Sequence, residues 1–134
     1  MAEGQSGKAI ATDRAPAAVG PYSQAVRVGP WLWCSGQIPL DPRTGRLVEG
    51  GIAEQTRQCL KNLEAVLSAG GATPASVVKT TVYLARIEDF AAFNEIYGDW
   101  VGDPPPARAT VAVSSLPKGA LVEIDAVAYV GESG

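Results

Sequence analysis

The sequence contains no histidine among its 134 residues. This absence excludes catalysis by a Ser-His-Asp triad or a Cys-His pair, and it excludes zinc sites built on imidazole. It also removes the side chain that most often acts as a general base near neutral pH. Any reaction must therefore rely on carboxylates, Arg, Lys, Tyr, hydroxyl groups, backbone amides and water.

Cysteine is scarce as well, with only Cys34 and Cys59 in the chain. Their number and separation do not fit a metal knuckle or a redox C-x-x-C pair, so no metal site is expected. Their neighbouring residues read WLWCSG and RQCLKN. We therefore expect two buried free thiols, the usual state of cysteine in a cytoplasmic protein.

Long apolar runs and basic clusters are also missing. No stretch approaches the ~20 apolar residues that a membrane-spanning helix needs, and the N-terminal MAEGQSGKAI lacks the apolar core of a signal peptide. The net charge is −3, the pI is near 4.9, and Lys and Arg occur singly. Binding to nucleic acid through a broad basic face is therefore not expected. These features predict a soluble cytoplasmic protein without a membrane partner.

What the chain does contain is a mixture of helical and strand-like segments. Its 46% apolar and 19% charged residues are typical of an ordered globular protein, and its length suits a single domain over residues 8–134 behind a flexible tail at 1–7. Helical spacing predicts helices over 52–69 and 89–101. Alternating or β-branched runs predict strands over 8–12, 24–28, 31–35, 77–84, 108–113 and 121–130. The last two are expected to form a hairpin around the loop SSLPKG. The order predicts an α+β fold with two helices packed on one face of a mainly antiparallel sheet.

The predicted strands have two unlike faces, because side chains alternate along a strand. In 121–130 one face is wholly apolar and should lie under the helices, whereas Glu123 and Asp125 lie on the other. In 77–84, Val78, Val82 and Leu84 are assigned to one face. The second face mixes apolar and polar side chains, which is unfavourable in water, so we expect it to contact another subunit.

Arg108 follows three consecutive prolines at the start of a predicted strand, and Glu123 interrupts an apolar run. Together they suggest a pocket that binds an anion and handles water. A simpler alternative treats Glu123 and Asp125 as part of a solvated sheet face, and Arg108 as one partner of a surface ion pair. These residues alone do not decide between the two interpretations.

Several segments together resemble the reactive intermediate deaminase A family, also called RidA or YjgF. The similarity runs from about Lys8 to Val130 and depends on these motifs: APAAVGPYSQA, CSGQIPLDPRTG, QTRQCLKNLEAVL, VVKTTVYL, FAAFNEIYGDW, PPARATV and LPKGALVEIDA. The resemblance implies a chorismate-mutase-like fold and a homotrimer with a central barrel and three pockets between subunits. It also implies hydrolysis of 2-imino acids (2-iminopropanoate, 2-iminobutanoate) or their enamines to 2-oxo acids and ammonia, without a metal or organic cofactor.

The resemblance also implies roles for individual residues. Arg108 would bind the substrate carboxylate, helped by the backbone N–H of Thr110, where many members of the family have Cys. Glu123 would hold or activate the attacking water. The remaining family pocket positions are matched by Tyr22, Ser35, Gly36 and Asn94. We interpret Arg108 and Glu123 as lying on the same mixed sheet face, and the sequence leaves open whether they meet within one chain or across an interface.

Two other classes of function stay open. The protein could bind 2-oxo acids or similar carboxylates without catalysis, or act as a chaperone-like trimer. Relatives have also been described as endoribonucleases, although the acidic composition disfavours that activity. RNA cleavage should fall steeply with added salt, whereas a pure binding protein should show no turnover and should not need Glu123.

Overall fold

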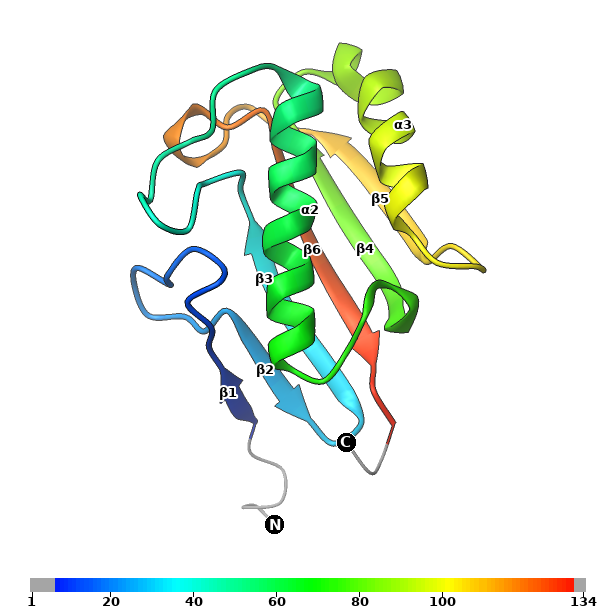
Figure 1. Ribbon diagram of the computed structural model, residues 1–134. Coiled ribbons are helices and arrows are strands. Elements are labelled where there is room, and N and C mark those ends of the chain that lie inside the picture. The colour runs from blue at the N-terminus through cyan, green and yellow to red at the C-terminus, as the bar shows by residue number, and fades with distance from the viewer. Residues whose placement is uncertain (1–6, 132–134) are drawn as a thin grey trace.

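The computed structural model describes residues 7–131. Six strands form one sheet in the order β1-β2-β3-β6-β4-β5 (Figure 1). The longer elements are β1 (Lys8–Ile10), β2 (Ala25–Val28), β3 (Trp31–Gln37), α2 (Ile52–Ala69), β4 (Val77–Leu84), α3 (Phe90–Trp100), β5 (Ala107–Ala112) and β6 (Val122–Tyr129). Three short 3-10 turns complete the order: η1 (Pro74–Ser76), η2 (Ile87–Asp89) and η3 (Pro117–Gly119). The predicted α+β class and its two long helices are confirmed.

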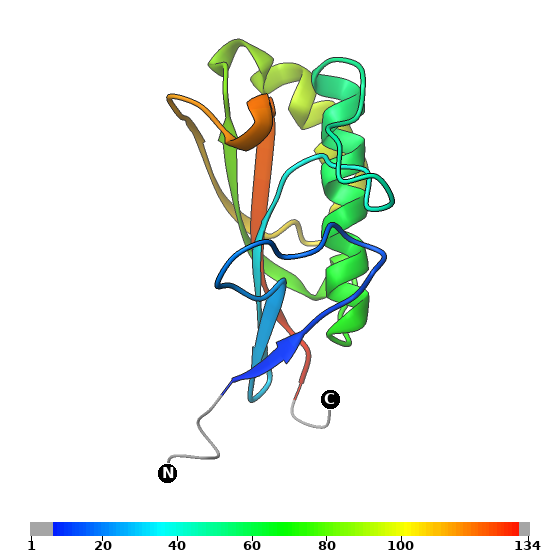
Figure 2. The same ribbon diagram turned by 90° about the vertical axis from the view of Figure 1, so that its left-hand side faces the viewer.

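Both helices cover the same face of the sheet, and Figure 2 shows them together on one side of it. α2 is amphipathic and buries Leu63, Val66 and Leu67 completely. The apolar face of β6 lies against these side chains, as predicted, because its alternate residues from Val122 to Ala128 are all buried. The core thus fills the space between one sheet face and two helices.

The sheet is mainly antiparallel, but its last strands are arranged differently from the prediction. Strands 108–113 and 121–130 were interpreted as a hairpin, and this is wrong. β6 lies between β3 and β4, antiparallel to both, while β5 pairs in parallel with β4 at the edge of the sheet. The connecting residues, which include η3, are long enough for β6 to enter the sheet centre, where α2 covers its apolar face.

The sheet face predicted for Val78 in β4 is also wrong. Val78 was assigned to the face of Val82 and Leu84, yet its side chain is exposed while theirs are fully buried. The pairing of β4 with β6 shifts between Val77 and Lys79, which marks a β-bulge. A bulge adds one residue to one strand and so reverses the alternation at that point. Val77 therefore takes the buried position.

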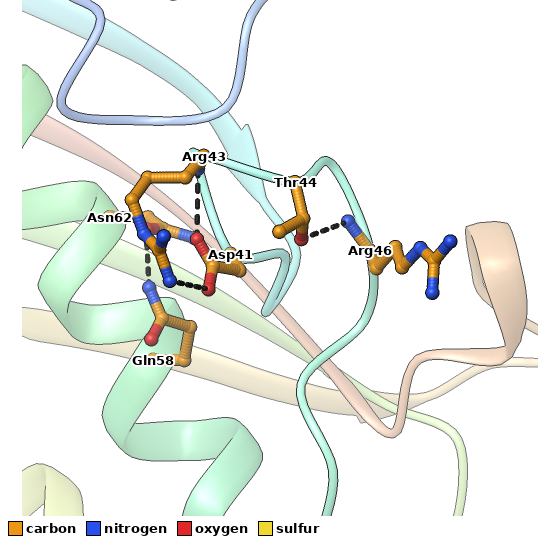
Figure 3. A network of polar contacts seen from close by, with 6 residues as sticks. All are labelled: Asp41, Arg43, Thr44, Arg46, Gln58 and Asn62. Carbon is orange, nitrogen blue, oxygen red and sulfur yellow. Dashed lines mark hydrogen bonds and ion pairs between the residues drawn. The ribbon is translucent and has the colours of Figure 1, made fainter.

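The loop between β3 and α2 is fastened to the helix by a polar network (Figure 3). Asn62 of α2 donates through Nδ2 to the carbonyl oxygens of Ile38 (3.2 Å) and Leu40 (2.9 Å), and its Oδ1 accepts from Gln58 Nε2 at 2.8 Å. Asp41 Oδ1 accepts from the backbone N–H of Arg43 at 2.8 Å within the loop's own turn. The network fixes Ile38 and Leu40, which form part of a pocket wall.

The predicted flexible tail at residues 1–7 lies outside the described residues except for Gly7. Across the described part of the chain, 7–131, no helix combines the length and the apolar character that a membrane span requires.

Candidate functional site

Glu123 lies in a pocket of about 420 Å³, here called the Glu123 pocket. Of the predicted site residues, Tyr22, Ser35, Gly36 and Glu123 all line it, although they come from three distant segments. Gly36 is needed for space rather than for backbone freedom, because its φ is not positive. A Cβ at Gly36 would overlap Glu123 Oε2 and lie 2.9 Å from Cδ.

The environment of Glu123 favours its protonated form. Burial raises the pKa of this carboxyl above its usual range, and the nearby charge of Asp125 raises the pKa further. Asp125 lies two residues along β6 on the same sheet face and accepts a hydrogen bond from Tyr83 Oη at 2.9 Å. A carboxyl with a raised pKa can both take up and release a proton nearer to neutral pH.

Ser35 and Tyr22 are held by the backbone of the pocket wall. Ser35 Oγ donates to the carbonyl of Ser23 at 2.6 Å, so its proton is used within the pocket wall. Tyr22 is about half exposed. The segment that carries it is fixed by buried Gln24, whose amide donates to Thr12 O and Pro16 O and accepts from Thr12 N.

Lys118 is a pocket residue that the sequence interpretation missed. It lines the Glu123 pocket beside Pro117 and has a left-handed backbone with φ 59° and ψ 18°. This conformation is uncommon for a residue with a side chain. The Pro-Lys-Gly triplet indicates a turn, but nothing local to it shows that the turn lies next to Glu123.

Arg108 lies in a second, more open cavity beside α3, lined also by Asn94, Tyr97 and Pro106. Arg108 Nη1 donates to Asn94 Oδ1 at 2.8 Å. Its guanidinium carbon lies 5.1 Å from the ring centroid of Tyr97 and 5.4 Å from that of Phe90. The structure therefore brings Arg108 and Asn94, two of the predicted site residues, into direct contact.

The two groups of site residues lie on opposite faces of the sheet. Arg108 is the register partner of Thr80, which is buried against α3, whereas Glu123 is the partner of Tyr83 on the face away from the helices. Paired residues in neighbouring strands point to the same side of a sheet. The prediction that Arg108 and Glu123 share one face is therefore wrong.

Thr110 lies on the same side of β5 as Arg108, two residues further along. Its Oγ1 is buried and has no hydrogen-bond partner within the described residues. A buried unpaired hydroxyl costs about 1–3 kcal/mol. The contact predicted for Thr110 uses its backbone N–H rather than this hydroxyl.

Both cysteines are buried free thiols, as predicted. Burial, with a smaller contribution from the charge of Asp125, raises the pKa of Cys34 to about 12. Burial also raises the pKa of Cys59, whose Sγ donates to Gln37 O at 2.8 Å. Neither thiol supplies a thiolate near neutral pH, so neither can act as a nucleophile there.

The sheet face opposite the helices carries an apolar surface, here called the open face. Trp31 and Tyr129 are register partners on it, and their rings make an edge-to-face contact with centroids 5.1 Å apart. Several large apolar side chains there are 37–55% exposed: Val28, Trp31, Trp33, Val111 and Tyr129. Glu123 and Asp125 lie on this same face. A contiguous apolar face of this kind is typical of an interface.

Known proteins resemble this chain both in sequence and in fold. The model of the family described as "Endoribonuclease L-PSP" matches residues 12–130. A mouse protein named 2-iminobutanoate/2-iminopropanoate deaminase is 51% identical over 92% of this chain and 92% of its own length. The crystal structure of RidA from an Antarctic Psychrobacter has a TM-score of 0.88, with 46% identity over 91% of this chain and 98% of that one.

A third relative is the E. coli protein TdcF, solved with bound serine. It has a TM-score of 0.86 and 38% identity, over 91% of this chain and 98% of that one. The fold and sites thus define a small α+β protein of the L-PSP class. The chain belongs to the RidA/YjgF family, whose family model is the one described as Endoribonuclease L-PSP.

Proposed function

We propose that this protein hydrolyses reactive 2-imino acids, such as 2-iminopropanoate and 2-iminobutanoate, or their enamine tautomers, to 2-oxo acids and ammonia. The observation that carries the proposal is the combination of an Arg108 that has no acidic partner within residues 7–131 with a half-buried Glu123 of raised pKa. The name of the mouse relative supports the same reaction. We further propose that residues 8–134 act as one domain and that the reaction takes place in the cytoplasm.

Arg108 is proposed to bind the substrate carboxylate. Its one recorded hydrogen bond uses Nη1, so within residues 7–131 the other guanidinium N–H groups have no partner. Two parallel N–H groups match the two oxygens of a carboxylate. The backbone N–H of Thr110, on the same side of β5, is proposed as a further donor. The serine bound to E. coli TdcF carries a carboxylate of the same kind.

Glu123 is proposed to position and activate water. In its ionised form it takes one proton from water as the water oxygen bonds to the carbon of the protonated imine and the C=N π electrons move to nitrogen, which gives a neutral carbinolamine. Glu123 then returns this proton to nitrogen, the C–N bond breaks as ammonia leaves, and the carbinolamine hydroxyl loses its proton to Glu123 as the carbonyl of the 2-oxo acid forms. Tyr22, Ser35 and Gly36 would shape the Glu123 pocket around this centre. Holding the water and the imine side by side lowers the entropic part of the activation barrier for hydrolysis.

The site is proposed to form between subunits of a homotrimer. Arg108 and Glu123 lie on opposite sheet faces, so a single chain presents them to different surroundings. When the open face of one subunit contacts the β5 edge of the next, the Glu123 pocket of the first can face the Arg108 of the second. A repeated contact between unlike surfaces closes into a ring when its rotation between subunits is one third of a full turn for a trimer. The exposed Trp and Tyr side chains of the open face supply apolar area for it.

The pH profile offers a test of Glu123. Asp125→Asn is expected to move the acidic limb of kcat/KM to lower pH. The charge of Asp125 adds to burial in raising the pKa of Glu123, so removing that charge lowers the pKa. A base works when deprotonated, so a lower pKa extends activity into acid. Asp99→Asn on α3 removes an equal charge and should leave the limb in place. An unmoved limb in Asp125→Asn would show that another group sets it.

The alternatives make different predictions. A protein that only binds 2-oxo acids or serves as a chaperone-like trimer would show no turnover, and its affinity would not depend on Glu123. The family description favours an endoribonuclease, but the net charge of −3 gives little attraction for phosphate. RNA cleavage that falls steeply with salt would favour that activity instead.

The test is the release of ammonia and 2-oxo acid from freshly generated 2-iminopropanoate. Wild type is expected to accelerate it, and Arg108→Ala to lose at least about 100-fold of that acceleration with its oligomeric mass unchanged. A folded wild type that does not accelerate hydrolysis would reject the proposal. In that case a binding function would be the best remaining interpretation.

A further inference from the structure

The Arg108 side chain is held without an acidic partner. Its guanidinium contacts two aromatic rings and one amide of α3, and the one ion pair recorded within residues 7–131 joins Arg43 to Asp41. An exposed arginine loses considerable rotamer entropy when it is fixed. Something on α3 must therefore keep Arg108 in place before a ligand arrives.

Tyr97 is the best anchored of the three contacts. Only 5% of Tyr97 is exposed, compared with 37% of Phe90. Its ring stacks on Phe93 with centroids 5.2 Å apart, and its hydroxyl lies 2.6 Å from Thr80 Oγ1 in a buried hydrogen bond. Phe90 lies at the start of α3 and is more exposed than Tyr97, so its ring is less constrained and is the weaker support for Arg108.

Thr80 connects Arg108 and Tyr97 through β4. It is fully buried in β4, its backbone is the register partner of Arg108 in β5, and its hydroxyl bonds to Tyr97. The same residue thus fixes the strand position of Arg108 and the ring over which the guanidinium lies. Arg108, Thr80 and Tyr97 form a closed set of contacts between β5, β4 and α3.

An aromatic ring holds a guanidinium differently from a carboxylate. It attracts the cation through its π face and takes none of the N–H donors. A carboxylate would occupy those donors and compete with an anionic ligand. A ring therefore fixes Arg108 while its charge and its donor edge stay available for a substrate carboxylate.

We propose that Tyr97 is the positioning residue of Arg108, with Thr80 as its anchor. This inference rests on the proposed function for its kinetic consequence, but the positioning itself can be measured without turnover. Tyr97→Leu removes the ring, Tyr97→Phe keeps it, and Thr80→Val removes only the partner of the hydroxyl. Val66→Ala, which removes buried side-chain volume from α2, serves as a control for general destabilisation.

The first measurement is kinetic. In Tyr97→Leu the KM for 2-iminopropanoate is expected to rise about tenfold with kcat within about twofold, because the ring acts on carboxylate binding. Tyr97→Phe should recover most of the affinity, Thr80→Val should resemble Tyr97→Phe, and Val66→Ala should leave KM unchanged. An unchanged KM in a folded Tyr97→Leu would overturn the inference, as would a loss of kcat alone.

The second measurement is the Arg108 Nε–H signal in a ¹⁵N–¹H NMR spectrum, identified by its absence in Arg108→Lys. Ring currents should displace the signal in wild type, Tyr97→Phe should keep the displacement, and Tyr97→Leu should move it toward the free-arginine position. A signal that does not move in Tyr97→Leu would reject positioning by Tyr97. This readout does not depend on imine hydrolysis, so failure of the proposed function and failure of this inference are distinguishable.

Discussion

Arg108→Ala and Glu123→Ala, each inactive as a pure protein, are expected to regain about a quarter of wild-type activity when their subunits are mixed equally and reassembled. In a ring where each site takes Arg108 from one subunit and Glu123 from its neighbour, a site is intact only when both contributing subunits carry the right residue. Random mixing gives each condition a chance of about one half. The two residues lie on opposite sheet faces, which is the reason to expect this behaviour.

The matched control mixes wild type with the double variant Arg108→Ala/Glu123→Ala. A site shared between subunits again leaves about a quarter of the sites intact, whereas a site within one chain leaves about half. Subunit exchange is checked by native mass spectrometry. If the two single variants stay inactive after verified exchange, the shared site is rejected and Arg108 and Glu123 must act within one chain or not together.

Gly36→Ala is expected to reduce activity by about 100-fold or more while leaving the fold intact. The new methyl group would take the place of the Glu123 carboxylate. The atoms it meets belong to the end of a flexible side chain, so Glu123 can rotate away at small cost to stability. Alanine also loses less backbone entropy than glycine on folding. The predicted result is thus a protein with nearly wild-type thermal stability and a misplaced carboxylate.

The measurement pairs kcat/KM with the thermal midpoint, and Gly51→Ala is the control, since a Cβ at Gly51 meets nothing within 4 Å. Gly51 precedes α2 as its N-cap, where the change should cost little activity. Wild-type kcat/KM in Gly36→Ala would mean that the position of the Glu123 carboxylate does not matter for the reaction. A collapse of the thermal midpoint would instead show that the methyl group displaces backbone.

Local patterns allowed much of the fold to be predicted. The bounds of α2 and β4 are those expected from helical spacing and from a β-branched run, because both signals are complete within their own segments. The buried face of β6 followed from simple alternation. Strand pairing is a different matter: whether β6 pairs with β5 or enters between β3 and β4 depends on which neighbour covers its apolar face.

The site residues also show which properties can be predicted from one segment and which depend on the assembled sheet. Alternation shows that a strand has two faces, but it does not show which face of β5 is shared with which face of β6. That relation is fixed by register, Thr80 with Arg108 and Tyr83 with Glu123, which is a property of the assembled sheet. The bulge at Val78 and the place of Lys118 beside the Glu123 pocket are likewise properties of assembly. The site residues themselves were proposed largely from the family resemblance.

The two buried thiols have a consequence for a protein proposed to handle reactive intermediates. The carbon of an imine is electrophilic, so a nucleophilic side chain can add to it. Cysteine reacts as its thiolate, and with a pKa of about 12 the Cys34 thiol is almost entirely protonated in neutral solution. Cys59 is fully buried and its pKa is raised as well. With no histidine in the chain either, neither a thiolate nor an imidazole is available to react with the proposed substrates at neutral pH.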